Sequence, residues 1–274
     1  MLAVAAGLAG CREPSAATVA AAPPPDVPYV NGNPMQPVSQ VPRDPGRPYV
    51  MTVRLTIHRV ELPLGTASRS ERLWRYFDEE VVDPAVIAVL QRNGFRLGRA
   101  RTDDWPAVSR VLEELAGAAP GISQALALPG RQQPLVLKEH LGFQRLFVLD
   151  RRGLLTGQDY PPGDNVLMMT CHINDQDPTE VIFQAVPVVV SRKKIQRWEH
   201  TEQGYRRQEQ RVEVPIELLE FSVRAPKGTY LVIGPGADVL RDTSAGRSFL
   251  VSERGGLRYE TLLVVVPEVF AAPA

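Results

Sequence analysis

The chain has 274 residues, 44% of them apolar and 23% charged, which suffices for one large domain or two small ones. Its 31 basic and 31 acidic side chains balance, so it lacks the overall positive charge of a general binder of nucleic acid or anionic membranes. Two cysteines, Cys11 and Cys171, are too few for a disulfide scaffold or a four-ligand structural zinc site. No apolar run approaches the roughly 20 residues that a membrane-spanning helix needs.

The first ten residues are small and apolar, and they end in Leu8-Ala9-Gly10-Cys11, which has the form of a lipobox. This resembles the signal peptide of bacterial lipoproteins. The resemblance implies that residues 1–10 are removed and that Cys11 is acylated, anchoring the chain to a membrane of the cell envelope. Arg12 is not the aspartate associated with inner-membrane retention in that family, which favours the outer membrane and a periplasm-facing domain. The alternative is an apolar N-terminal strand or helical turn with a buried cysteine.

The segment after the lipobox is rich in proline. Ten of the 25 prolines lie between Arg12 and Pro48, where large apolar residues are scarce. Such a segment cannot bury enough surface to offset its ordering entropy. We therefore predict that residues 11–50 are a disordered tether, either a semi-rigid spacer that rises up to ~3 Å per residue or a plain disordered terminus.

Regular structure is predicted from about Met51. Apolar and polar side chains alternate from Val53 to Ile57, the period-two pattern of a half-buried strand. The phase then flips, because Val60 to Leu64 carries the apolar side chains at even positions. We therefore predict a β-bulge near His58 or Arg59.

Helices are predicted after this strand. A capping box at Ser68 opens the first, Asp83 caps the second with Gly94 just past its end, and the third spans 104–117. A short strand over 95–99 separates the second helix from the third. The apolar stripe of the first helix is Leu73, Trp74, Phe77 and Val81.

Beyond residue 120 the helical period disappears and turn residues separate short apolar runs. The predicted strands are Leu135–Lys138, Leu146–Leu149, Val166–Ile173, Val181–Val190, Val212–Val223, Tyr230–Ile233, Phe249–Ser252 and Leu257–Val266. Two or three early helices followed by a long antiparallel tract is the α+β pattern. We predict one such domain over residues 51–270.

Several segments of this domain resemble the core of secretins. Residues 228–234, Gly-Thr-Tyr-Leu-Val-Ile-Gly, resemble a strand segment of that family, and residues 260–270 resemble its closing strand. Residues 166–187 resemble its paired core strands. The resemblance implies a β-rich core that associates with copies of itself or with envelope and secretion proteins. Pro235 replaces the second glycine of the family's pair, and the family's preceding docking domains have no counterpart in the tether.

A charged excursion interrupts the strands. Residues 192–211 hold seven Lys or Arg against three Glu, which a lipid-facing strand could not carry, so we expect no open channel from this chain alone. One interpretation is a solvated hairpin tip. The other is a contact with an anionic partner or with lipid headgroups. The residues that would make this contact, with Tyr205 beside them, are Arg192, Lys193, Lys194, Arg197 and Trp198.

No motif predicts catalysis. The four histidines, His58, His140, His172 and His200, lie in different elements without metal-ligand spacing. Cys171 alternates with apolar residues and is expected to be buried and inert. The carboxylates near predicted turns, expected to serve turn chemistry, are Asp164, Asp175, Asp177 and Glu180. We therefore expect neither a metal nor a cofactor, and no nucleic-acid partner.

Two hypotheses for the function follow. The first is a lipid-anchored, non-enzymatic envelope protein with a secretin-like core and a structural or interaction role. The second is a periplasmic enzyme or small-ligand-binding protein whose site is assembled from distant residues. A deep polar pocket with a strongly shifted His or carboxylate pKa would favour the second hypothesis.

Overall fold

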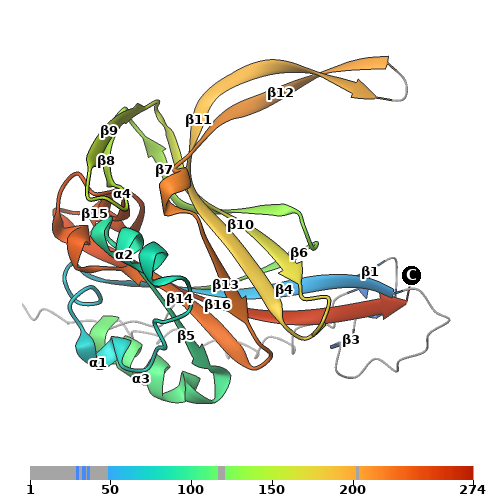
Figure 1. The fold of residues 1–274 in the computed structure, drawn as a ribbon, viewed down its shortest axis with the longest axis horizontal. Coiled ribbons are helices and arrows are strands. Elements are labelled where there is room, and N and C mark those ends of the chain that lie inside the picture. Colours follow the sequence, from blue (N-terminus) through green and yellow to red (C-terminus); the bar gives the residue numbers. More distant parts are fainter. Residues whose placement is uncertain are drawn as a thin grey trace, which may run out of the picture.

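The computed structural model describes residues 29–30, 33–34, 36–37, 49–116, 121–201 and 204–273. The predicted signal peptide, Cys11 and most of the tether lie outside these residues. Within them the protein is predominantly antiparallel β-structure with short helices (Figure 1). The helices are α1 (Glu71–Trp74), α2 (Pro84–Arg92), α3 (Trp105–Ala116) and α4 (Ala245–Leu250).

One sheet of seven strands has the order β5-β14-β16-β4-β6, with β3 and β15 also paired to β16. Its strands are β3 (Gln36–Pro37), β4 (Tyr49–Pro63), β5 (Phe95–Arg101), β6 (Gly121–Ala127), β14 (Thr229–Pro235), β15 (Val251–Arg254) and β16 (Leu257–Pro273). The two segments that resemble secretin strands are neighbours in it, because β14 pairs with β16 from Leu231↔Val265 to Ile233↔Leu263.

A second sheet of five strands has the order β12-β11-β10-β7, and β13 also pairs with β11. Its strands are β7 (Gln132–Leu141), β10 (Gly163–Ile173), β11 (Val181–Thr201), β12 (Gly204–Pro215) and β13 (Phe221–Ala225). Two small hairpins complete the strands, β1 (Tyr29–Val30) with β2 (Asn33–Pro34) and β8 (Gln144–Leu149) with β9 (Leu155–Tyr160).

Two hydrophobic cores lie on opposite faces of the seven-stranded sheet. The first fills the space between the two sheets and includes Leu55, Phe183 and Leu263. The second lies between the seven-stranded sheet and helices α1 and α3, and includes Trp74 and Leu112. The sheet is therefore the middle layer of the molecule, and Figure 1 shows α1 and α3 together beside it.

The predicted bulge near His58 is wrong. Strand β4 pairs with β16 residue by residue from Tyr49↔Pro273 to Pro63↔Tyr259 without a register shift. The apolar phase flips because the strand serves both cores in turn. Val53 to Ile57 faces the first core at odd positions, and Val60 and Leu62 face the second at even positions.

The second predicted helix is confirmed, whereas the first is shorter than predicted and has a different cap. Helix α2 has the predicted Asp83 cap, whose carboxylate accepts from the Ala85 amide at 2.8 Å, and Gly94 follows it at φ +82°. Helix α1 is a single turn instead of the predicted helix over residues 68–81, and its cap is Ser70. Ser68 does not cap because its hydroxyl donates to Glu260 at 2.6 Å. The predicted end of α3 at Gly117 lies outside the described residues.

Two later elements also differ from the prediction. Phe249 lies in the short helix α4, which ends at Leu250, and β15 begins only at Val251, although the apolar run over 249–252 suggested one strand. The run over 212–223 is split into β12 and β13 by a helical turn at Glu217–Leu219. The split follows from pairing, since β13 takes the first part of β11 and β12 takes the rest.

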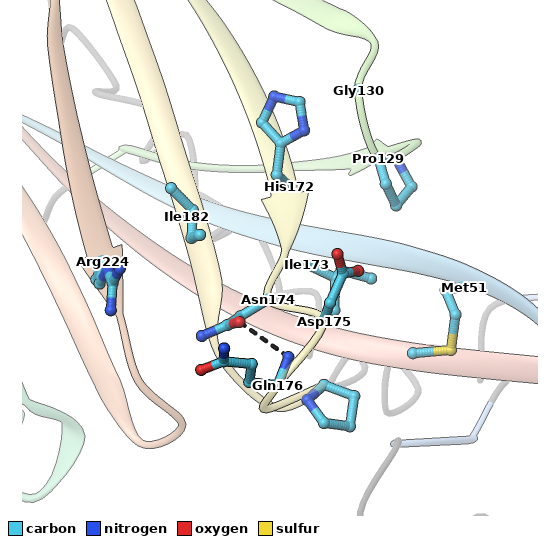
Figure 2. A pocket seen from close by; sticks show the side chains of 11 residues that line it. Met51, Pro129, Gly130, His172, Ile173, Asn174, Asp175, Gln176, Ile182 and Arg224 are labelled. Carbon is cyan, nitrogen blue, oxygen red and sulfur yellow. Dashed lines mark hydrogen bonds between the residues drawn. The ribbon is translucent and has the colours of Figure 1, made fainter.

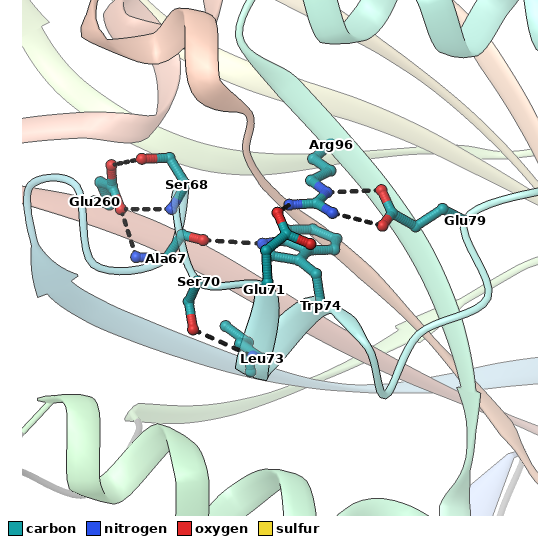
Figure 3. Close-up of polar contacts among 9 residues, drawn as sticks. All are labelled: Ala67, Ser68, Ser70, Glu71, Leu73, Trp74, Glu79, Arg96 and Glu260. Carbon is teal, nitrogen blue, oxygen red and sulfur yellow. Dashed lines mark hydrogen bonds and ion pairs between the residues drawn. The ribbon is translucent and has the colours of Figure 1, made fainter.

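A buried carboxylate holds the loop that precedes α1 (Figure 3). Glu260 of β16 is fully buried and accepts hydrogen bonds from the amides of Ala67 and Ser68 at 2.8 and 3.0 Å and from the Ser68 hydroxyl. It also accepts a hydrogen bond of 2.8 Å from the Gly65 amide. The same loop holds Trp74, whose ring nitrogen donates to the Ala67 carbonyl at 2.9 Å. One side chain therefore ties the edge of the second core to the central strand.

We expect Glu260→Ala to lower the free energy of unfolding by about 3 kcal/mol, because it leaves two buried amides and one partly buried amide without an acceptor. Glu260→Gln should cost less, since one carbonyl oxygen remains. The measurement is urea denaturation. Glu253→Ala, an exposed carboxylate of β15, is the control and should change stability by less than about 0.5 kcal/mol. Equal losses for Glu253→Ala and Glu260→Ala would contradict this role.

Candidate functional site

A two-stranded ribbon stands away from the body of the molecule (Figure 1). We define the ribbon as residues 192–201 of β11 and 204–211 of β12, which pair from Lys194↔Arg211 to Thr201↔Gly204. It is the charged excursion of the sequence, and its two strands pair antiparallel. No helix among the described residues is both long and apolar enough to cross a membrane.

The ribbon leaves the sheet at an irregularity in the pairing of β11 with β12. Val190 pairs with Glu213 and Lys194 with Arg211, so three residues of β11 face one residue of β12. Ser191 is still paired with Gly163 of β10, and the Arg192 amide donates to the Pro162 carbonyl at 3.1 Å. A Cβ atom on Gly163 would lie 2.3 Å from the Val190 carbonyl oxygen, so the close approach of β10 requires glycine there.

The register sorts the side chains of the ribbon onto two faces. Residues directly opposite each other share a face, so Trp198 and Arg207 lie together, and Tyr205 joins them two residues before Arg207. Trp198 is 65% exposed and Tyr205 is 75% exposed. Lys194 and Arg211 lie on the same face nearer the body. We name these five residues the aromatic–basic face.

Some charges of the ribbon are paired and others are not. The Lys194 ammonium lies 3.0 Å from Glu209, and the Arg211 guanidinium lies 3.1 Å from Asp164. The exposed side chains of Arg192, Lys193 and Arg207 form no ion pair with a described carboxylate. The ribbon therefore presents uncompensated positive charge next to two exposed aromatic rings.

The structure brings the predicted contact residues to one part of the molecule. Arg192, Lys193, Lys194 and Trp198 are all exposed on the ribbon, and Arg197 belongs to its backbone. Sequence reasoning did not single out Arg207, because its pairing with Trp198 depends on the register of the hairpin.

An open cleft of about 900 Å³ lies where the turn between β10 and β11 faces Met51 (Figure 2). His172, Asp175 and Arg224 line it, but its hydrogen bonds shape the turn: the Gln176 amide donates to Asn174 Oδ1 at 3.0 Å. Hydrogen bonds from Thr179 lower the pKa of Asp177. The turn role predicted for this carboxylate therefore holds, whereas Asp164 lies within strand β10 and contacts the ribbon.

A second open cleft, of about 910 Å³, lies between β4, β7 and β15. The Lys138 ammonium donates to the Arg247 carbonyl at 3.1 Å, and burial together with the charge of Arg247 lowers the pKa of Lys138 to about 8. Arg59 donates to the Leu137 carbonyl at 2.8 Å. Glu61 accepts two hydrogen bonds from Arg254 at 2.7 and 2.8 Å. The polar groups of the cleft are thus largely engaged with one another.

The remaining candidates for chemistry, Cys171, His58 and His172, lie in three different surroundings. Cys171 is fully buried, and burial raises the pKa of its thiol to about 12. His58 stacks against Trp105 with ring centroids 4.7 Å apart, and burial lowers its pKa. His172 lines the first cleft. Over the described ranges, no group of three or more His, Cys, Asp or Glu side chains could hold a metal ion.

The structure is that of a β-rich protein with an exposed two-stranded ribbon. No family model and no curated protein matches the sequence. Among solved structures, the chain is similar to the InvG secretin domain β-barrel from the Salmonella SPI-1 injectisome, with 9% identity and a TM-score of 0.17. The match covers 82% of this chain and 59% of that chain, so this chain spans less than two thirds of it. The function proposed below therefore rests on this chain's own residues.

We expect the stability of the protein to rise between pH 7.5 and pH 10 by about 2 kcal/mol through Lys138 alone. In this window the unfolded state, with the ordinary lysine pKa, binds the proton that the folded state releases at about pH 8. Raising the pH therefore favours the folded state. Lys138→Met should remove this part of the pH dependence in urea denaturation. If the free energy of unfolding of Lys138→Met rises as much between pH 7.5 and pH 10 as that of the parent, the lowered pKa of Lys138 is contradicted.

Proposed function

We propose that this protein is a lipid-anchored component of the cell envelope that acts by contact and carries out no catalysis. Its secretin-like β-rich core would be a rigid base, and the ribbon would be the contact element. The observation that carries the proposal is the ribbon itself, on which Trp198 and Tyr205 are largely exposed beside cations that form no ion pair with a described carboxylate.

The exposure of two large aromatic side chains on the ribbon suggests that a partner covers them. A two-stranded hairpin by itself is only marginally stable in water, so a ribbon that extends beyond its sheet obtains little stability from its own pairing. Large aromatic side chains that stay exposed side by side are typical of interaction sites. The ribbon is therefore better explained as a surface that is covered in the envelope than as a structural strut.

The proposal does not include an open channel. The ribbon places charged residues on both strands, including Lys194 and Glu209, so neither strand offers the uninterrupted apolar face that lipid requires. The partners would be further copies of the chain or other envelope components. Attachment would come from the acyl group on Cys11, at the outer membrane and facing the periplasm.

A second candidate function is small-ligand binding in the cleft of Lys138. The observation that favours it is the lowered pKa of this lysine, since perturbed groups in clefts are candidates for binding. An anionic ligand that pairs with the ammonium would raise the pKa of Lys138 and would reduce the pH dependence described above.

The anchor is tested on the full reading frame expressed in a Gram-negative bacterium. We expect mass spectrometry of the mature protein to show a diacylglycerol-type mass on Cys11 and no trace of residues 1–10, because the lipobox directs both steps. Cys11→Ser should release the chain from the membrane fraction. Unmodified Cys11 in the mature chain would contradict the anchor.

The contact role is tested by labelling one introduced cysteine with a maleimide. Gln196→Cys lies on the exposed ribbon, and Arg152→Cys in the exposed turn between β8 and β9 is its control. Cys171 should not react, because its buried thiol stays protonated. We expect labelling at Gln196→Cys to be several-fold slower in native envelopes than in purified protein, and labelling at Arg152→Cys to be similar in both. Equal ratios at the two sites would overturn the contact role.

A further inference from the structure

We infer that the ribbon binds the anionic headgroups of a phospholipid bilayer through its aromatic–basic face. The inference rests on the proposed function, since it names what covers the ribbon in the envelope. It depends on three features of the ribbon: the two aromatic rings on its aromatic–basic face, three exposed cations that form no ion pair with a described carboxylate, and its position outside the two clefts described above.

The two rings are arranged as a pair at one end of the ribbon. Trp198 lies opposite Arg207, and Tyr205 lies on the same face two residues before Arg207, so this cation neighbours both aromatic residues in the register. Trp and Tyr have apolar rings with one polar atom, and they favour the boundary between hydrocarbon and headgroups. Trp198 and Tyr205 are 65% and 75% exposed, so both present most of their surface to the surroundings of the ribbon.

The charges of the ribbon select an anionic surface. Residues 192–211 carry seven basic and three acidic side chains, whereas the whole chain is neutral, so positive charge is concentrated here. Lys194 is compensated by Glu209. Arg192, Lys193 and Arg207 form no ion pair with a described carboxylate, and basic residues near an anionic bilayer are attracted to its headgroups.

The shape of the face favours lipid over a protein partner. A stable protein interface needs a well-packed apolar centre with pockets for its anchor residues. Neither cleft described above is lined by ribbon residues. A narrow ribbon with two rings and scattered cations suits a fluid surface of headgroups, which adapts to it.

The test uses the full chain with Cys11→Ser, so that no acyl group contributes, and vesicles of two compositions. We expect binding to vesicles of phosphatidylcholine with phosphatidylglycerol, weakening as salt is added, and little binding to phosphatidylcholine alone. The double variant Lys193→Glu with Arg207→Glu should bind at least about tenfold more weakly. The matched control is Arg151→Glu with Arg152→Glu, which makes the same charge change in the β8–β9 turn and should bind like the parent.

Fluorescence identifies the ring that enters the bilayer. Trp74 is buried and Trp105 packs against His58 and Tyr230, so Trp198 is the exposed indole of the three. We expect a blue shift of the emission on vesicle binding in the parent and not in Trp198→Phe. Trp198→Ala with Tyr205→Ala should weaken binding, whereas Trp198→Phe should largely retain it.

The outcomes separate the two proposals. Equal binding to both vesicle types, or full binding by the charge-reversed ribbon, would overturn the headgroup contact. If vesicles are not bound while Gln196→Cys remains protected in native envelopes, the ribbon is covered by a protein, so the lipid inference fails and the contact role stands. If that protection is also absent, the contact role fails with it.

Discussion

The pairing of β4 with β16 is the constraint on which the rest of the structure depends. It joins Tyr49 to Pro273 and Pro63 to Tyr259, so the two ends of the described domain form the centre of one sheet (Figure 1). Both faces of this pair are covered, one by the second sheet and the other by α1 and α3. Because the contacts are distant in sequence, the central sheet can be completed only when the C-terminal segment is present.

Glu260 extends this constraint to the helical layer. Its carboxylate lies on β16 and its donors lie in the loop after β4, so pairing of the two strands also positions Trp74 over the sheet. The guanidinium of Arg96 stacks on the Trp74 ring at 4.3 Å and binds Glu79 through two hydrogen bonds of 2.6 Å (Figure 3). Polar groups thus fix the second core at its edge, where apolar packing alone would leave the loop free to shift.

The longest strand of the second sheet, β11, has a buried part and an exposed part. The first part of β11 is buried against β10 and β13, and its second part leaves the core as the ribbon. The change falls between two adjacent residues, because Ser191 is buried and Arg192 is exposed. A rigid sheet therefore carries a charged, aromatic extension without exposing its own core. One part of β11 packs in the core and the other part is exposed as the ribbon. The proposed contact role depends on this division of the strand.

The sequence by itself determined the β-rich character of the domain, the caps of α2 and the concentration of charge in 192–211, because these follow from local periodicity, cap chemistry and composition. Tertiary structure decided the rest. The phase change at His58 looked like a bulge and is a strand between two cores, and Ser68 looked like a cap and is a ligand of Glu260. Trp198, Tyr205 and Arg207 share a face only through the register of β11 with β12. Register and layer order depend on contacts between distant residues, which no local pattern encodes.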